Sequence, residues 1–201
     1  MAADPSEPVL ESTIGSALAN AANDYPDHPG LVSGDPAVKG RRRWTFAEMH
    51  TQALIVAGTL LNHYKPGERI AVWAPNIPEW VLLQLGVGMA GLVLVPLNPV
   101  FRKSELEYAL KQSQAAGIFY VPEYRDNPLA DWVAEAKINI PTLRETVSFA
   151  DWDLFLGSGI SKQSPVRRGP TQCHDSWSQR QSNRNRSPSD RYPEGRTFPN
   201  C

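Results

Sequence analysis

Hydrophobic and polar positions follow one another along the chain in blocks whose spacing predicts helices and strands in turn. The longest apolar block runs from Trp80 to Val95, where Gln84 is the only strongly polar side chain. A helix that crosses a bilayer needs about 20 predominantly apolar residues. This block is shorter than that, and three glycines interrupt it. A membrane span is therefore the less favoured of its interpretations.

The composition changes inside this block and divides it into two elements. Residues 77–90 suit a helix, and Pro78 falls in its first turn, where a missing backbone N–H costs little. The run LVLV, residues 92–95, follows Gly91 and is typical of a strand that is buried on both faces. We therefore predict a helix, a break at Gly91 and a strand.

A local capping signal predicts the helix that precedes this block. In the stretch TFAE, the hydroxyl of Thr45 and the carboxylate of Glu48 can satisfy free N–H groups of a first helical turn. The helix should end near residue 62. Its predicted inward face consists of Met49, Ala53, Val56 and Leu60.

The remaining elements show the same alternation of helical and strand patterns. Ser104 and Glu107 form a second predicted capping box, SELE, at the start of a further helix. With this helix over residues 104–114, the remaining predicted helices cover residues 12–23 and 129–137. The predicted strands cover residues 31–33, 69–73 and 117–121. Short apolar strands joined by helices imply a mostly parallel sheet that is flanked by helices. We predict a partial, layered α/β fold over residues 1–160.

The pattern stops after Gly159. Residues 161–201 contain no leucine and few other aliphatic side chains. Such a segment cannot bury enough apolar area to offset an ordering entropy of about 1–2 kcal/mol per residue. We therefore predict a disordered tail over residues 161–201.

Charge is distributed unevenly along the chain. The formal net charge is −1, but the tail is basic and the part before it is acidic. The tail sequence SNRNRSPSDR superficially resembles a nucleic-acid-binding segment, although it has no regular repeat and no folded RNA-binding module. The alternative interpretation of the chain is thus a non-catalytic scaffold or nucleic-acid-binding module that uses this tail.

The cysteines, the histidines and Ser158 do not form a catalytic or metal-binding motif in the sequence. Cys173 and Cys201 have neither the spacing of a zinc site nor that of a disulfide framework. The four histidines show no paired carboxylate or second histidine at ligand spacing, so we predict surface or turn positions for them. Ser158 lies in GSG, which is not a nucleophile elbow. The first 23 residues lack the pattern of a secretory signal, and a cytoplasmic location is expected.

Two long stretches carry a resemblance to a known family. They are WTFAEMHTQALIVAGTL and KPGERIAVWAPNIPEWVLLQLGVGMAGLVLVPLNPVFRKSELEYAL, and FADWDLFL follows them. Residues 25–157 resemble the N-terminal portion of the AMP-binding, adenylate-forming acyl-CoA synthetases, the fatty acid–CoA ligases among them. The order PLNP then SELEYAL is the most specific part of the match.

The resemblance implies a two-step reaction. A carboxylic acid attacks the α-phosphate of ATP to give an acyl-adenylate and pyrophosphate, and the thiol of CoA then displaces AMP. ATP, Mg²⁺ and CoA are the implied cofactors, and the acid and CoA are the implied partners, with no nucleic acid and no membrane span. Arg102 and Lys103 are candidate contacts to the phosphates of CoA, although a solvated loop before a helix is the simpler interpretation. Asn98 is predicted to fix its loop through an Asx turn, and Trp80 to pack in the core.

The sequence also departs from this family. It lacks the Ser/Thr/Gly-rich loop ending in Pro-Lys-Gly that holds the triphosphate, and the later family motifs are missing too. No catalytic residue and no metal ligand is therefore assigned, and we predict a truncated member that is inactive alone and binds the cofactors poorly. Read one base later, DRYPEGR can encode Thr-Gly-Thr-Pro-Lys-Gly. A frameshifted or mis-spliced tail is our hypothesis for the missing loop.

Overall fold

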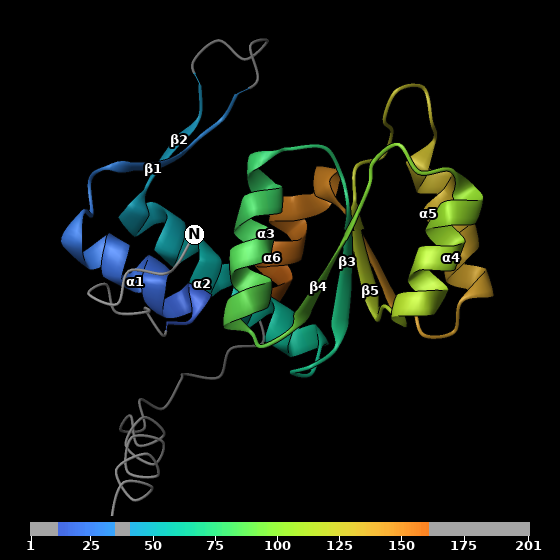
Figure 1. Ribbon diagram of the computed structural model, residues 1–201, viewed down its shortest axis with the longest axis horizontal. Helices are drawn as coiled ribbons and strands as arrows, with labels where there is room; N and C mark the ends of the chain where they lie inside the picture. The colour runs from blue at the N-terminus through green and yellow to red at the C-terminus, as the bar shows by residue number, and fades with distance from the viewer. Residues whose placement is uncertain (1–11, 35–40, 161–201) are drawn as a thin grey trace, which may run out of the picture. The chain divides into compact units, whose positions relative to one another are not determined.

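The computed structural model describes residues 12–34 and 41–160, and the side chains of residues 12–34 and 41–158 (Figure 1). The prediction of a disordered tail, the two cysteines and the out-of-frame hypothesis lie outside the described residues. So does His174.

The centre of the described part is a sheet of four parallel strands. They are β3 (Arg69–Trp73), β4 (Val93–Leu97), β5 (Gly117–Tyr120) and β6 (Glu145–Ser148). Their order across the sheet is β4–β3–β5–β6. Trp73 lies opposite Leu97 on one side and opposite Tyr120 on the other. The predicted α/β fold with a parallel sheet is confirmed.

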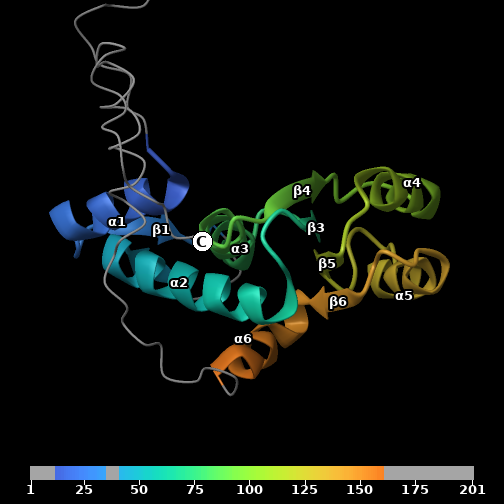
Figure 2. The same ribbon diagram turned by 90° about the horizontal axis from the view of Figure 1, so that it is seen from below.

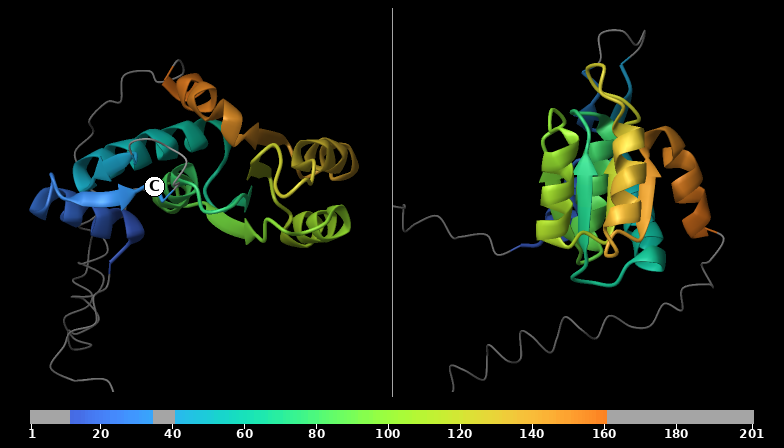
Figure 3. Two further views of the ribbon diagram at one scale, coloured as in Figure 1. Left: turned by 90° about the horizontal axis from the view of Figure 1, so that it is seen from above. Right: turned by 90° about the vertical axis from the view of Figure 1, so that its right-hand side faces the viewer.

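Helices cover both faces of this sheet (Figures 2 and 3). The three crossover helices are α3 (Pro78–Met89), α4 (Lys103–Ser113) and α5 (Leu129–Asn139). The chain leaves β3 for β4 on one side and then returns past β3 to β5. Because such crossovers are right-handed, the two directions place α3 on one face and α4 and α5 on the other. The helices α2 (Phe46–His63) and α6 (Trp152–Ile160) join α3.

Each face of the sheet has its own hydrophobic core. Alternate side chains of a strand point to opposite faces. Ile70 and Val72 therefore pack against α2, α3 and α6, whereas Ala71 and Trp73 pack against α4 and α5. All four side chains are fully buried. Residues 70–73 of this strand are thus interior on both faces, as a central parallel strand should be, and only Arg69 at its start is exposed.

A small layer lies beside the first core. It consists of α1 (Ile14–Asp24) and the antiparallel hairpin of β1 (Pro29–Val32) and β2 (Arg43–Thr45). The predicted capping box at the start of α2 is present. The Thr45 N–H donates to Glu48 Oε2 at 2.8 Å, and the Glu48 N–H donates to Thr45 Oγ1 at 3.2 Å. The predicted inward face of α2 is buried.

The longest apolar block is a helix, a break and a strand, as predicted. It is α3, Gly91 with φ +67° and β4. No helix within residues 12–34 and 41–160 combines the length and the apolar composition that a bilayer crossing requires. The prediction that this strand is buried on both faces is wrong, because β4 lies at an edge and Val93 is 46% exposed.

Two further predictions need correction. Helix α4 begins at Lys103 rather than Ser104, and the carboxylate that caps it belongs to Glu105, which accepts the Arg102 N–H at 2.8 Å. Three elements that were not predicted, β6, the 3₁₀ turn η1 (Phe149–Asp151) and α6, together complete the first core.

Candidate functional site

The topology itself indicates where a ligand would bind. In open α/β sheets, ligands lie outside the carboxyl ends of the strands, at the point where successive crossovers run in opposite directions. Here that point lies between β3 and β5. The loops that follow the strands at this edge are residues 74–77, 98–102 and 121–128. The candidate site is therefore built from these loops and the helices that they open.

The loop after β4 is held by the core beneath it. The indole Nε1 of buried Trp73 donates to the backbone oxygen of Asn98 at 2.9 Å. The Asn98 Oδ1 accepts the Val100 N–H at 3.1 Å, so the predicted Asx turn is present. The same backbone oxygen also accepts the Phe101 N–H at 3.0 Å. This leaves Arg102 in a defined position at the start of α4.

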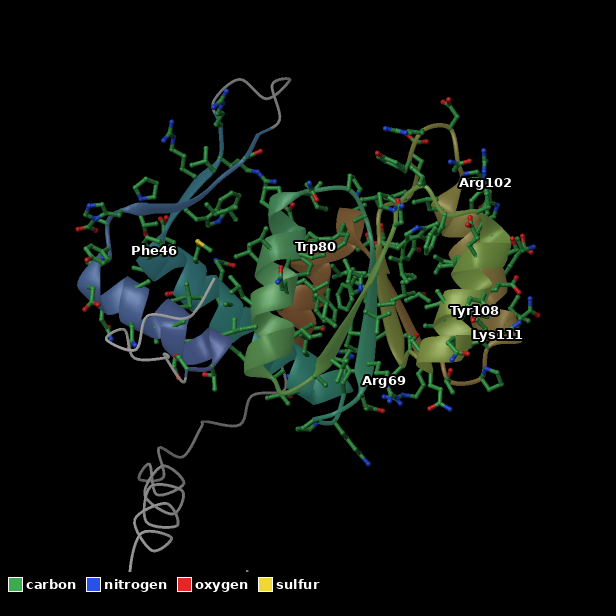
Figure 4. All side chains as sticks on the ribbon, viewed as in Figure 1. Phe46, Arg69, Trp80, Arg102, Tyr108 and Lys111 are labelled. Atoms are coloured by element: carbon green, nitrogen blue, oxygen red, sulfur yellow. The ribbon has the colours of Figure 1, made fainter. Side chains whose placement is uncertain are left out.

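Arg102 lies at the carboxyl edge with a neutral partner. Its Nη1 donates to Asn127 Oδ1 at 2.6 Å. An amide oxygen carries no formal charge, so this contact orients the guanidinium without cancelling its positive charge. Arg102 directly precedes α4, where Figure 4 labels it, and its side chain is exposed. The side chain is therefore available to an anion.

Lys103 has a different environment. Its Nζ forms an ion pair with a carboxylate oxygen of Glu135, which belongs to α5. The hydrogen bond to Glu135 raises the pKa of Lys103, and the nearby charges of Glu135 and Glu107 act in the same direction. The structure thus brings both predicted residues to one edge, but only Arg102 lacks a carboxylate partner in these contacts. An anion would have to compete with Glu135 for Lys103.

A cavity of about 510 Å³ lies beside these two residues. We call it the α4–α5 cavity, and it is lined by Arg102, Lys103, Ser104, Glu107 and Trp132. The Trp132 ring stacks on that of Trp73, with the centroids 6.3 Å apart and the planes 25° apart. The cavity thus combines two cations and a hydroxyl with an aromatic side chain.

The loop after β5 supplies the partner of Arg102. Tyr124 and Asn127 exchange backbone hydrogen bonds at 3.0 and 3.1 Å. The two residues between them, Arg125 and Asp126, have φ of +47° and +62°, a conformation that side-chain-bearing residues seldom adopt. Neither the turn nor its contact to Arg102 was predicted, because Asn127 lies 25 residues along the chain from Arg102.

A larger cavity, of about 610 Å³, lies at the opposite edge of the sheet. Its charged lining residues are Lys65, Glu68, Arg69 and Arg144. Helices end at this edge, since each crossover helix precedes a strand, and their carbonyl ends favour cations over anions. Arg144 is moreover paired with both oxygens of Glu68, at 2.6 and 2.9 Å. This edge is therefore the less suitable one for an anionic ligand.

One group of side chains has the residue types of a catalytic triad. The prediction that histidines lack a carboxylate partner is wrong for His63, whose Nδ1 lies 2.9 Å from Glu145 Oε1. Its Nε2 lies 3.4 Å from the Oγ of Ser158. However, that hydroxyl donates to the Phe155 backbone oxygen at 2.6 Å and lies inside α6, so the contact fixes the helix rather than activating a nucleophile.

The family model of the AMP-binding enzymes matches residues 18–185. The chain belongs to the AMP-binding enzyme family. The matched span includes all of the main sheet and the α4–α5 cavity, and it continues into residues 161–185.

Relatives of this AMP-binding chain include acyl-CoA ligases. It is 31% identical over 131 residues to the mitochondrial medium-chain acyl-CoA ligase ACSF2 of Danio rerio. It is 34% identical over 138 residues to the putative acyl-CoA synthetase YngI of Bacillus subtilis. The aligned parts are 65% and 68% of this chain, but only 21% and 24% of those proteins. The chain thus corresponds to less than a quarter of each relative.

Solved structures of AMP-binding enzymes share the fold. A fatty acyl-CoA synthetase of Mycobacterium tuberculosis matches with a TM-score of 0.63 at 25% identity, covering 79% of this chain and 30% of that one. The N-terminal domain of FACL13 from the same organism also gives 0.63, at 22% identity, covering 80% of this chain and 40% of that domain. The resemblance to acyl-CoA synthetases that the sequence indicated is confirmed.

Proposed function

We propose that this chain is the N-terminal part of an ATP-dependent acid–CoA ligase. The parent reaction converts a medium or long carboxylic acid, ATP and CoA into acyl-CoA, AMP and pyrophosphate. Membership of the AMP-binding family and acyl-CoA ligases among the relatives support this class of reaction. The observation that carries it to this chain is the placement of Arg102 and Lys103 at the carboxyl edge of the sheet, where helices begin.

We also propose that Arg102 and Lys103 contact the phosphates of CoA. Arg102 is exposed and has an amide as its partner, so binding a phosphate does not require breaking an ion pair. A guanidinium also matches phosphate geometry with two parallel hydrogen bonds. Lys103 would add a second charge once it leaves Glu135.

A direct test compares CoA with dephospho-CoA, which lacks the 3′-phosphate, by titration calorimetry. Arg102→Gln should weaken CoA binding about tenfold, the loss of one hydrogen bond to a charged group. Arg69→Gln is the matched control, because Arg69 is an exposed arginine at the opposite edge. Equal weakening by both substitutions would contradict the proposed contact.

The residues described here do not fit a role in holding ATP or Mg²⁺. Within residues 12–34 and 41–160, no group of three His, Cys, Asp or Glu side chains is arranged to hold a metal ion. The sequence has no Ser/Thr/Gly-rich phosphate loop either. No step through ATP or Mg²⁺ is therefore assigned to this chain, and we propose that the 201 residues alone do not form the adenylate.

An exchange assay tests this proposal. The chain is incubated with ATP, labelled pyrophosphate and a series of medium and long acids, beside a complete acyl-CoA synthetase as the positive control. We expect no acid-dependent exchange of label into ATP. Clear exchange that depends on the acid would overturn the proposed inactivity.

A cytoplasmic location stays a prediction, which fractionation of cells that express the chain would check.

A further inference from the structure

We propose that Trp132 is a base-stacking residue of the α4–α5 cavity, which would thus recognise a phosphorylated adenosine rather than phosphate alone. This inference rests on the proposed function, since CoA carries such a group. It adds to the proposed phosphate contacts of Arg102 and Lys103, because an aromatic side chain on α5 would distinguish an adenosine-containing ligand from phosphate alone.

The position of Trp132 supports this role. One side of its ring packs on Trp73, which is fully buried and held by its bond to Asn98. Trp132 itself is only partly buried, and it forms part of the cavity lining. A ring that is held by a buried neighbour and still borders a cavity is suited to stacking on a base.

The rest of the lining fits the sugar and phosphates. Arg102 and the hydroxyl of Ser104 border the same cavity. Glu107, the acidic lining residue, lies 3.4 Å from Lys111, which offsets part of its repulsion toward an anion. The volume of about 510 Å³ lies within the range of small-ligand sites. A nucleotide can therefore place its base on α5 and its phosphates at the start of α4.

Glu135 acts against binding in this arrangement. It lies three residues after Trp132 on α5, hence on the same side of the helix, and its carboxylate holds Lys103. A phosphate must replace this carboxylate to reach Lys103. Glu135→Gln should therefore strengthen phosphate binding, although Glu135 itself is not a ligand residue.

The test titrates the full chain with adenosine 3′,5′-bisphosphate and with inorganic pyrophosphate, by calorimetry. We expect the wild type to prefer the bisphosphate, since stacking adds affinity that pyrophosphate cannot use. Trp132→Leu should weaken bisphosphate binding about tenfold and leave pyrophosphate binding unchanged. Trp132→Phe should retain most of the preference, and Glu135→Gln should tighten both ligands.

Trp80→Leu is the matched control, because Trp80 is another partly buried tryptophan but lies on α3, on the opposite face of the sheet (Figure 4). It should keep the preference. If the wild type binds both ligands equally, or if Trp132→Leu keeps the preference, the stacking role is wrong while the phosphate contacts stand. If neither ligand binds, the proposed CoA contacts are wrong as well. If Trp132→Leu does not fold, the stacking role is still tested by the preference of the wild type for the bisphosphate and by the binding of both ligands to Trp132→Phe.

Discussion

At the scale of single residues, the charge of each partner decides what a basic side chain can still do. Arg102 is oriented by an amide, Lys103 is neutralised by Glu135, and Arg144 is held by both oxygens of Glu68. Only the amide contact of Arg102 lets an anion bind the charged group without first breaking an ion pair. The same residue types therefore make a candidate site at one edge of the sheet and a structural contact at the other.

The pair of Glu68 and Arg144 predicts a measurable dependence of stability on pH. Hydrogen bonds from Arg144 lower the pKa of Glu68 from 4.5 to about 2. A carboxyl group whose pKa falls on folding stabilises the folded state above its unfolded pKa, and this contribution is lost as pH falls from about 4.5 to 2. Glu68→Gln should thus lower the free energy of unfolding at pH 6 by at most about 1 kcal/mol, because Arg144 is exposed and Glu68 is only partly buried.

Urea unfolding at pH 6 and at pH 2.5 checks this prediction. The difference between wild type and Glu68→Gln should be present at pH 6 and shrink at pH 2.5. Glu123→Gln serves as the control, since Glu123 is exposed and forms no ion pair with a side chain of residues 12–34 or 41–158. A difference that grows on acidification would show that Glu68 acts in another way.

Most local contacts at this scale could be predicted from the sequence, although the cap of α4 was assigned to Glu107 instead of Glu105, and distant contacts could not be predicted. The capping box of Thr45 and Glu48 and the Asx turn of Asn98 each involve residues at most three apart, so their spacing reveals them. The pair of His63 and Glu145 forms only because β6 and the end of α2 meet in the folded chain. The same holds for Arg102 and its amide partner.

At the scale of elements, the contact between α2 and α3 depends on one glycine. A Cβ on Gly86 would lie 2.4 Å from Val56 Cγ1 and 3.2 Å from the backbone nitrogen of Ala57. Val56 is fully buried, and its branched side chain has little freedom to move. Gly86→Ala should therefore lower the free energy of unfolding by about 1–3 kcal/mol, the usual cost of overpacking.

Gly157 provides a matched control for this substitution. It is also a helical glycine, but a Cβ there would meet nothing within 4 Å. Gly157→Ala should leave stability unchanged or raise it by up to about 1 kcal/mol, because alanine favours a helix. Urea unfolding followed by circular dichroism compares the two. Equal effects would mean that helix propensity, not packing against Val56, governs both sites.

Among the described strands, β4 lies at an edge of the main sheet, and this position predicts an effect on association. The Val93 N–H donates inward to the Glu68 backbone oxygen at 2.9 Å. Since donors alternate along a strand, residues 94 and 96 direct their backbone outward, and Pro96 has no N–H to offer there. Proline on an exposed edge prevents pairing with another chain. Pro96→Val should therefore increase the apparent mass in light scattering at high concentration, and Pro128→Val, in a loop, should not.

The elements that the sequence missed share a physical cause. β6 reads ETVS, which has one β-branched aliphatic residue and no apolar run. It is a strand because β5 pairs with it, and only its Val147 reaches the first core. Helix α6 contains two glycines and is built onto that core through Trp152 and Phe155. Tertiary contacts therefore decide both elements, whereas β3 and α2 are evident from their own patterns.

At the scale of the whole molecule, two hydrophobic cores share one sheet, and both lie within residues 12–160. The first core is closed by α6, at the end of the described part. Each core draws on elements from distant parts of the sequence, so neither should unfold without the other. The family match, however, runs on to residue 185. Whether the residues after α6 add to the folded unit is thus a separate question.

We predict that the residues after α6 do not add to the folded unit. A chain that ends at Gln163 should show the same urea midpoint as the full chain, because the residues removed include no leucine and little other aliphatic surface. It should also show the same m-value, since this slope measures the surface that unfolding exposes, and a segment without a core contributes little to it. Equilibrium unfolding of both chains, followed by tryptophan fluorescence at 295 nm excitation on a variant lacking Trp177, provides the comparison. A lower midpoint together with a smaller m-value for the shorter chain would mean that residues 164–201 fold with the sheet, and the predicted boundary near residue 160 would then be wrong.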